Sequence, residues 1–146
     1  MSLKSLERFT AKFSNPQNIE AVVISAASEH EAEIIALNHS QLKRGKLSNG
    51  EDTQEYASLP YVNYKSSIGS TSLPNADLYV TGKFYKAWDI DFKNTEFTIK
   101  STDAKAPKLE FQYGNEIYGL TRDSKGAASR IIAPIFVNKM RNEIKQ

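Results

Sequence analysis

The sequence predicts an α+β fold in a single domain over residues 1–146, with an antiparallel β-hairpin packed against N-terminal and C-terminal helices and a long extended loop. Three observations lead to this prediction. Apolar residues recur at helical spacing over 19–42, they alternate with charged residues from Trp88, and no period persists over 43–77. A chain of 146 residues, 40% of them hydrophobic, is also long enough to bury one core.

Composition limits the classes of function. The chain has no cysteine, which excludes disulfides and cysteine-ligated metal sites. Its formal net charge of +2 is too small to indicate nucleic acid or a membrane surface as a partner by itself. No segment approaches the ~18 consecutive apolar residues of a membrane span, and the N-terminus lacks the apolar stretch of a signal peptide. We therefore expect a soluble protein with no membrane partner, and no residue pattern indicates a cofactor or a metal site.

Two helices are predicted before residue 43. Apolar side chains recur every three or four residues over 19–42, and Asn15, Pro16 and Asn18 just before are typical of a helix start. A shorter helix is expected over residues 2–13, where leucine and phenylalanine side chains would pack against the rest of the domain.

Residues 43–77 are predicted to form a long loop or arm, because they contain three glycines, two prolines and many serines. Loops of this length are commonly functional or disordered, and we expect this one to be mobile in the isolated chain. Two interpretations stay open. Its tyrosines hold the loop to its own domain, or the loop docks on a neighbouring chain through large tyrosine contacts. The residues of that interface would be Tyr56, Tyr61, Tyr64 and Lys65.

A corner at Thr81 and Gly82 is predicted to lead into the hairpin. The Thr81 hydroxyl would cap one helical turn over "GKFYKA", and Gly82 would allow a positive φ or avoid a collision of a side chain with the hairpin. Two alternating segments follow, joined by a turn at Asn94-Thr95. The apolar face of this hairpin is predicted to consist of Trp88, Ile90, Phe92, Phe97 and Ile99.

A short helix is predicted between Pro107, which suits a first helical position, and Gly114, which suits a helix end. Leu109, together with Phe111 or Tyr113, is expected to face the sheet. Residues 78–146 would thus form an α+β core that ends in a C-terminal helix.

That last helix is predicted from about Asp123 to Lys145, with a broad apolar face. Pro134 lies inside it and would kink it or mark its true start. This part of the chain is basic and the 19–42 helix is acidic, which favours packing of the two against each other.

Four stretches follow one another in a distinctive order: "DLYVTGKFYKAWDIDF", "FTIKSTDAKAPKLEFQYG", "IYGLT" and "IIAPIFVNKMRNEI". With the Tyr-x-x-Tyr-Lys of the loop, their order and spacing resemble the small head–tail connector, or tail-completion, proteins of tailed bacteriophages. The versions from phages of Bacteroidetes-type hosts are the most similar. The resemblance covers about residues 19–146, and the first 18 residues have no counterpart.

The resemblance implies a structural virion protein without an active site or cofactor, assembled in the host bacterial cytoplasm. It implies a homo-oligomeric ring in the neck of the virion. The partners it implies are other virion proteins of the neck and tail, with DNA at most passing through the ring lumen.

Two other classes of function stay open from the residues. A nucleic-acid-binding accessory protein would use the tyrosines and basic residues of 43–77 together with the basic C-terminal helix. An enzyme would have to place its active site at the long loop, because neither His30 nor His39 has an obvious Ser or Asp partner in sequence.

Overall fold

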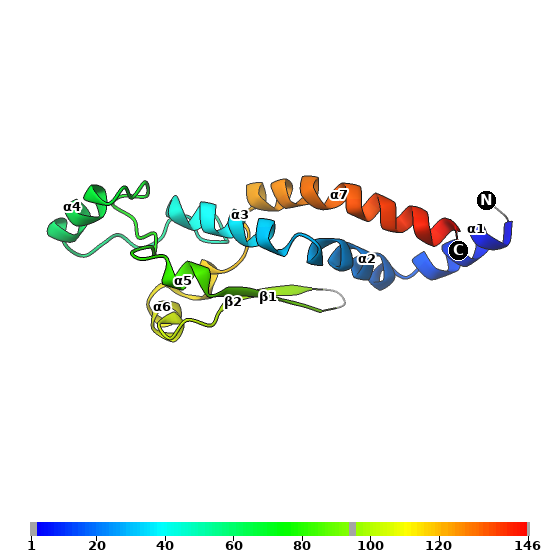
Figure 1. Cartoon of the computed structure of the whole chain (residues 1–146), viewed down its shortest axis with the longest axis horizontal. Helices are drawn as coiled ribbons and strands as arrows, with labels where there is room; N and C mark the ends of the chain where they lie inside the picture. The colour runs from blue at the N-terminus through cyan, green and yellow to red at the C-terminus, as the bar shows by residue number, and fades with distance from the viewer. Residues whose placement is uncertain (1–2, 94–95, 146) are drawn as a thin grey trace.

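The computed structural model describes residues 3–93 and 96–145, and the chain has an α+β fold, as predicted. The molecule is elongated (Figure 1). Helices α2 and α7 lie side by side with α1 at the outer end, and α4 lies at the opposite end. The elements are α1 Leu3–Phe13, α2 Pro16–Ser28, α3 Glu31–Lys43, α4 Leu59–Ser67, α5 Lys83–Lys86, β1 Trp88–Phe92, β2 Phe97–Ser101, α6 Ala106–Tyr113, the 3-10 helix η1 Asn115–Ile117 and α7 Arg122–Lys145.

The single helix predicted over 19–42 is wrong: the segment forms two helices, α2 and α3. The Asn15 side chain accepts a hydrogen bond from the Gln17 N–H at 3.0 Å, so α2 begins at the predicted cap. It ends where the N–H groups of Glu29 and His30 bond to carbonyls three residues back, which tightens the last turn. No glycine or proline marks this break, and the apolar periodicity continues across it.

The predicted hairpin forms, and its two strands are antiparallel. Trp88 is paired with Ser101, and Ile90 is paired with Ile99. Trp88, Ile90 and Ile99 are buried, whereas Phe92 and Phe97 are only half-buried and contact each other at the far end of the strands. The predicted turn at residues 94–95 lies outside the described residues. The core therefore lies at the base of the hairpin. Its buried members are Ala27, Ile34, Leu42, Phe84, Tyr85, Trp88, Ile90, Ile99, Ala106, Ile117, Leu120 and Ala128.

Two buried amides of α3 hold the connector between α6 and α7. The Asn38 side chain donates to the Ile117 carbonyl at 3.1 Å and accepts from the Gly119 N–H at 2.8 Å. Gln41 does the same one turn later, donating to the Gly119 carbonyl at 2.6 Å and accepting from the Thr121 N–H at 3.0 Å. Each buried amide thus satisfies backbone groups that would otherwise lack partners. This clamp fixes α6 and α7 relative to α3.

Helix α7 runs through Pro134 without ending there, so this proline does not mark the start of the helix. It packs against α1, α2 and α3, which confirms the contact expected between the basic and acidic helices. Lys139 Nζ lies 3.8 Å from Glu29 Oε2 across that contact. Within the described ranges, no helix is both long and apolar enough to cross a membrane.

Candidate partner-binding surface

The segment 43–77 is not the structureless loop expected from its composition. It contains α4, whose first turn has Pro60 and whose cap is Ser58, with Oγ accepting the Tyr61 N–H at 3.3 Å. The chain enters and leaves α4 side by side, because the Tyr56 N–H bonds to the Pro74 carbonyl at 3.0 Å. Ser58 followed by Pro60 is the sequence feature that could have located this helix. We call residues 43–77 the arm and α4 its end.

A buried ion pair lies at the base of α4. Lys65 is 1% exposed, and its Nζ lies 2.7 Å from Asp77 Oδ1 and also donates to the Tyr79 carbonyl. The sequence analysis placed Lys65 among the residues that contact a partner. That assignment is corrected here, because the side chain points into the arm and has no exposed surface for another chain.

Asp77 makes several further hydrogen bonds. Its carboxylate accepts from the Tyr56 hydroxyl at 3.0 Å, from the Ser70 hydroxyl at 2.8 Å and from the Tyr79 N–H at 3.0 Å. The Tyr56 hydroxyl in turn accepts from the Asp77 N–H at 3.1 Å. Burial alone would raise the pKa of Asp77, but the hydrogen bonds from Lys65, Tyr79 and Ser70 outweigh it and hold that pKa below its ordinary value. The carboxylate is therefore charged and fully paired.

The three tyrosines predicted as an interface lie in one row. The ring centroids of Tyr56 and Tyr61 are 4.9 Å apart, and those of Tyr61 and Tyr64 are 5.8 Å apart. Tyr56 is half-buried and holds the arm through Asp77, as the first interpretation expected. Tyr61 and Tyr64 are exposed, as docking on a neighbour would require. The contacts of Tyr56 thus fit the first interpretation, and docking through Tyr61 and Tyr64 stays a prediction.

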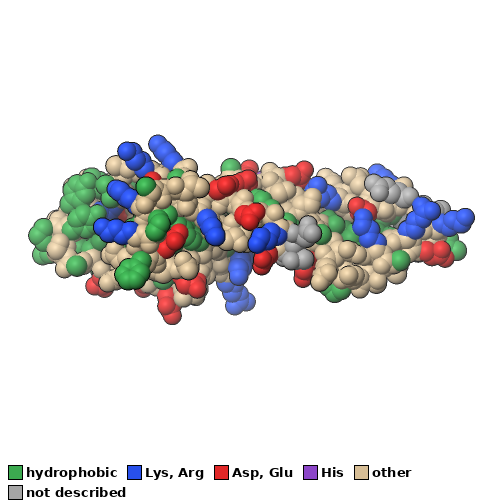
Figure 2. All heavy atoms as spheres, turned by 90° about the horizontal axis from the view of Figure 1, so that it is seen from below, with side chains coloured by type: hydrophobic (Ala, Val, Ile, Leu, Met, Phe, Trp, Pro, Cys, Tyr) green, Lys and Arg blue, Asp and Glu red, His purple; other side chains and the backbone are tan. Residues whose placement is uncertain are grey.

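The exposed end of the arm is apolar and uncharged. Leu59 is 70% exposed and Tyr64 46%, and Tyr61 and Ile68 are exposed beside them. We call these four residues the tip surface. Figure 2 shows the hydrophobic side chains gathered at the end of the molecule that Figure 1 assigns to α4.

Charge is absent from this surface for a specific reason. Between Tyr56 and Gly82 the only charged residues are Lys65 and Asp77, and both are buried against each other. Aromatic residues and a lack of charge distinguish the centre of a protein interface from ordinary surface.

The corner at Thr81 and Gly82 forms as predicted in its backbone. Gly82 has φ of 83°, which confirms the first reason given for a glycine, and a Cβ there would lie 3.1 Å from the Tyr79 hydroxyl rather than against the hairpin. The capping role of Thr81 is corrected: Gly82 occupies the cap position of α5, and the Thr81 hydroxyl accepts only a long bond of 3.4 Å from the Lys83 N–H.

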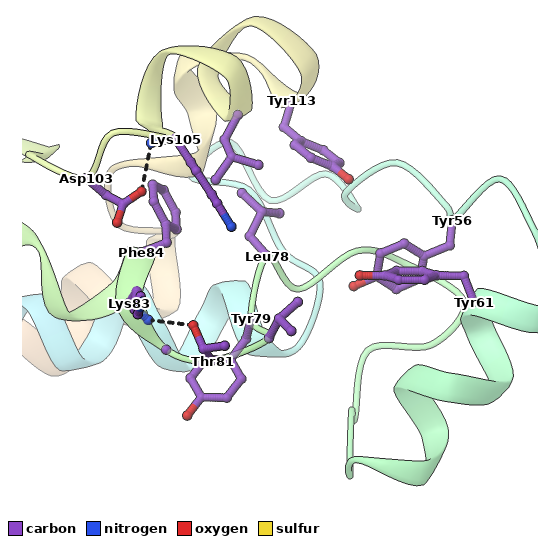
Figure 3. A pocket seen from close by; sticks show the side chains of 13 residues that line it. Tyr56, Tyr61, Leu78, Tyr79, Thr81, Lys83, Phe84, Asp103, Lys105 and Tyr113 are labelled. Carbon is purple, nitrogen blue, oxygen red and sulfur yellow. Dashed lines mark hydrogen bonds between the residues drawn. The ribbon is translucent and has the colours of Figure 1, made fainter.

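A groove of about 200 Å³ lies between the arm, the corner and α6 (Figure 3). Small-molecule sites usually measure about 300–1,000 Å³, so the groove is closer in size to one large side chain than to a cofactor. In Figure 3 the Lys105 side chain extends across it. Its other walls include Tyr56, Tyr61, Leu78, Val80, Phe84, Leu109 and Tyr113.

His39 lies in the aromatic core. Its ring stacks on Tyr85 at 4.5 Å and meets Trp88 edge-on at 4.6 Å. Burial, with a contribution from the Lys43 charge, lowers the pKa of His39 to about 4, so the imidazole is neutral near pH 7. Across residues 3–93 and 96–145, no three His, Cys, Asp or Glu side chains gather in a way that would hold a metal ion.

No protein-family model, curated protein or solved structure matches this chain.

Proposed function

We propose that this chain is a non-enzymatic structural subunit of the head–tail interface of a tailed bacteriophage, which binds a neighbouring subunit through its tip surface. The observation that carries the proposal is the tip surface itself. It exposes two leucine or isoleucine side chains and two tyrosines, while the only charges of the surrounding segment are buried as the Lys65–Asp77 pair. A patch of this kind marks an interaction site on a soluble domain.

The total surface of the chain supports an assembled state. The chain exposes 9292 Å². A compact monomer of 16.4 kDa would expose about 7,500 Å² by the usual scaling of surface with mass. The excess of about 1,800 Å², which follows from the elongated shape, is larger than the roughly 800 Å² that each partner buries in a standard interface. Neighbouring subunits on two sides would cover an area of this size.

The arm is suited to bind without a large entropic cost. The Lys65–Asp77 pair, the Tyr56 hydroxyl and the bond from the Tyr56 N–H to the Pro74 carbonyl fix its base within the chain. Mobility of the isolated arm, expected from its composition, therefore gives way to a preordered α4. A preordered interface loses less conformational freedom on binding than a disordered one.

The identity of the assembly rests on the resemblance to tail-completion proteins. On that basis the neighbours are other copies of this chain in a ring and the neck or tail proteins on either side, and the chain is located in the virion. DNA would meet the ring only through its lumen.

The test is a size measurement of the purified chain, alone and mixed with other virion proteins, compared with a tip variant. The variant Leu59→Ser/Tyr64→Ser/Ile68→Ser removes exposed side chains only, so its melting temperature should stay near that of the wild type. We expect the wild type to form a ring or join the particle, and we expect the tip variant to lose that property.

A matched control is Leu3→Ser/Leu6→Ser/Val137→Ser, which removes three exposed apolar side chains at the opposite end of the molecule. This control should assemble like the wild type. A wild-type chain that stays strictly monomeric and joins no particle would contradict the proposed function.

A further inference from the structure

Phe111 is the most exposed large apolar residue in the described part of the chain, at 93%. It lies on α6 between Leu109 and Tyr113, which are one turn apart on the opposite face of the helix and line the groove. Single exposed apolar residues are common, but an aromatic ring with almost no intramolecular contact gains much from a partner. Phe111 is therefore a projecting side chain that the described residues leave almost uncovered.

The groove on the other face of α6 has the properties of such a receptor. Its walls combine the rings of Tyr56, Tyr61 and Tyr113 with Leu109, and aromatic pairs in offset or edge-to-face contact add to the energy of simple burial. Its volume of about 200 Å³ suits a single large side chain. Of its own chain, the flexible Lys105 side chain extends across it and would have to move aside for a ring to enter.

We propose that Phe111 of one copy inserts into this groove of the next copy, so that α6 contributes to both halves of the contact. The inference deepens the proposed function, on which it rests, because it names the residues that join one copy to the next. Phe111, which we call the knob, and the groove lie on different faces of α6, so the contact is heterologous: each copy offers one of each, and repetition of the contact forms a ring when the rotation between copies closes.

The charges around the two halves are complementary. At the groove, Lys105 and Lys83 have no ion pair with any described residue, and Asp103 lies at the same edge. Beside Phe111 are Lys108 and Glu110.

Each knob charge has an opposite charge available at the groove. Glu110 uses Oε1 to accept the Tyr118 hydroxyl at 2.8 Å, which leaves Oε2 for a lysine of the next copy. Lys108 is exposed and would meet Asp103 of the next copy in the same way. Rim charges of this kind set the register and specificity of an interface more than its affinity.

A mixing experiment tests the inference. Phe111→Ser removes the knob and keeps the groove, whereas Val80→Trp fills the groove with an indole and keeps the knob. Each variant alone should associate at least about tenfold more weakly than the wild type, as expected for loss of a central aromatic anchor. Mixed at equal amounts, they should form a one-to-one dimer through the one knob-and-groove junction that remains. Sedimentation velocity distinguishes these species.

Two further variants keep the test decisive. Lys105→Glu reverses a charge at the groove edge without filling the groove, so it should weaken association less than Val80→Trp without disturbing the fold, and it too should pair with Phe111→Ser. Val137→Ser, an exposed apolar change on α7 far from α6, should associate like the wild type.

The outcomes separate this inference from the proposed function. If Phe111→Ser forms the same rings as the wild type, the knob-and-groove contact is wrong while the structural role stands. If the two variants fail to pair although each is folded, the contact is also wrong. If the wild type stays monomeric and joins no particle, both are wrong.

Discussion

Lys65 and Asp77 form a buried ion pair, with Lys65 Nζ 2.7 Å from Asp77 Oδ1, and they are the only two charged residues between Tyr56 and Gly82. The pair joins the last turn of α4 to the segment that leads into the corner, twelve residues further along the chain. It therefore does two things at once. It fixes the orientation of α4, and it removes both charges from the surface on which Leu59 and Tyr64 are exposed.

Breaking the pair should be costly. Lys65→Met leaves the Asp77 carboxylate buried without its cation, and loss of one partner of a buried pair usually costs about 3–5 kcal/mol of unfolding free energy. Urea unfolding measures the change. The control is Lys46→Met, which breaks the exposed pair of Lys46 with Asp52 and should cost less than about 1 kcal/mol. Equal effects of the two substitutions would show that the Lys65 pair is solvated rather than buried.

Gly82→Ala tests the corner. The new Cβ would require a left-handed backbone at φ of 83° and would press on the Tyr79 ring at 3.1–3.3 Å. The conformational part alone costs about 1–2 kcal/mol for a residue with a side chain. Gly50→Ala is the matched control, because Gly50 has φ of 87° but no atom within 4 Å of an added Cβ. We expect thermal unfolding to show a larger loss at Gly82. If Gly82→Ala loses no more thermal stability than Gly50→Ala, the contact with Tyr79 does not explain why residue 82 is a glycine.

Local patterns predicted those parts of the fold that depend on neighbours in sequence. The alternation of apolar and charged residues predicted the two strands of the hairpin, and the Thr-Gly pair predicted the corner and the helical turn of α5. The break between α2 and α3 was missed because Glu29 and His30 are ordinary helix residues, and the turn there serves the packing of α3 on β1.

Long-range contacts account for what was missed in the candidate site. Helix α4 has no apolar stripe that would indicate it in the sequence. Lys65 would be expected on the surface, but it is paired with Asp77, which lies near it only once the arm has folded. The amides of Asn38 and Gln41 likewise bond to residues about eighty positions away, and no local pattern indicates such a clamp. Tyr61 and Tyr64 could be proposed from the sequence as partner contacts, because a tyrosine in a serine-rich loop is a candidate contact on composition alone.

The hairpin should lose more stability at its base than at its end. Ile90 is buried, and Ile90→Ala should cost about 2–5 kcal/mol. Phe92 was predicted to be equally buried, but it is half-buried and packs on Phe97 at 5.8 Å, so Phe92→Ala should cost less despite its larger side chain. Urea unfolding of the two variants gives the comparison. The reverse order would mean that the end of the hairpin is covered, as an assembled neighbour would do.

Protonation of His39 should make the fold sensitive to mild acid. The pKa of His39 is about 4 in the folded chain, against an ordinary value of 6.5, because the ring is buried between Tyr85 and Trp88 and lies near the Lys43 charge. Between these two pH values the unfolded chain binds a proton that the folded chain does not, so stability falls as the pH falls from 6.5 to about 4.

Melting temperature measured across that pH window checks this prediction. His39→Phe keeps a ring against Tyr85 and Trp88 but cannot be protonated, so its melting temperature should fall less over the same window. The comparison is needed because carboxylates such as Asp77, whose pKa is held low in the folded chain, also lose stabilising charge as the pH drops. Asp77 contributes mainly at the acid end of the window, below its unfolded pKa, whereas the contribution of His39 begins near pH 6.5. A wild type and a His39→Phe variant with the same dependence between pH 6.5 and 5 would show that His39 is protonated within the fold.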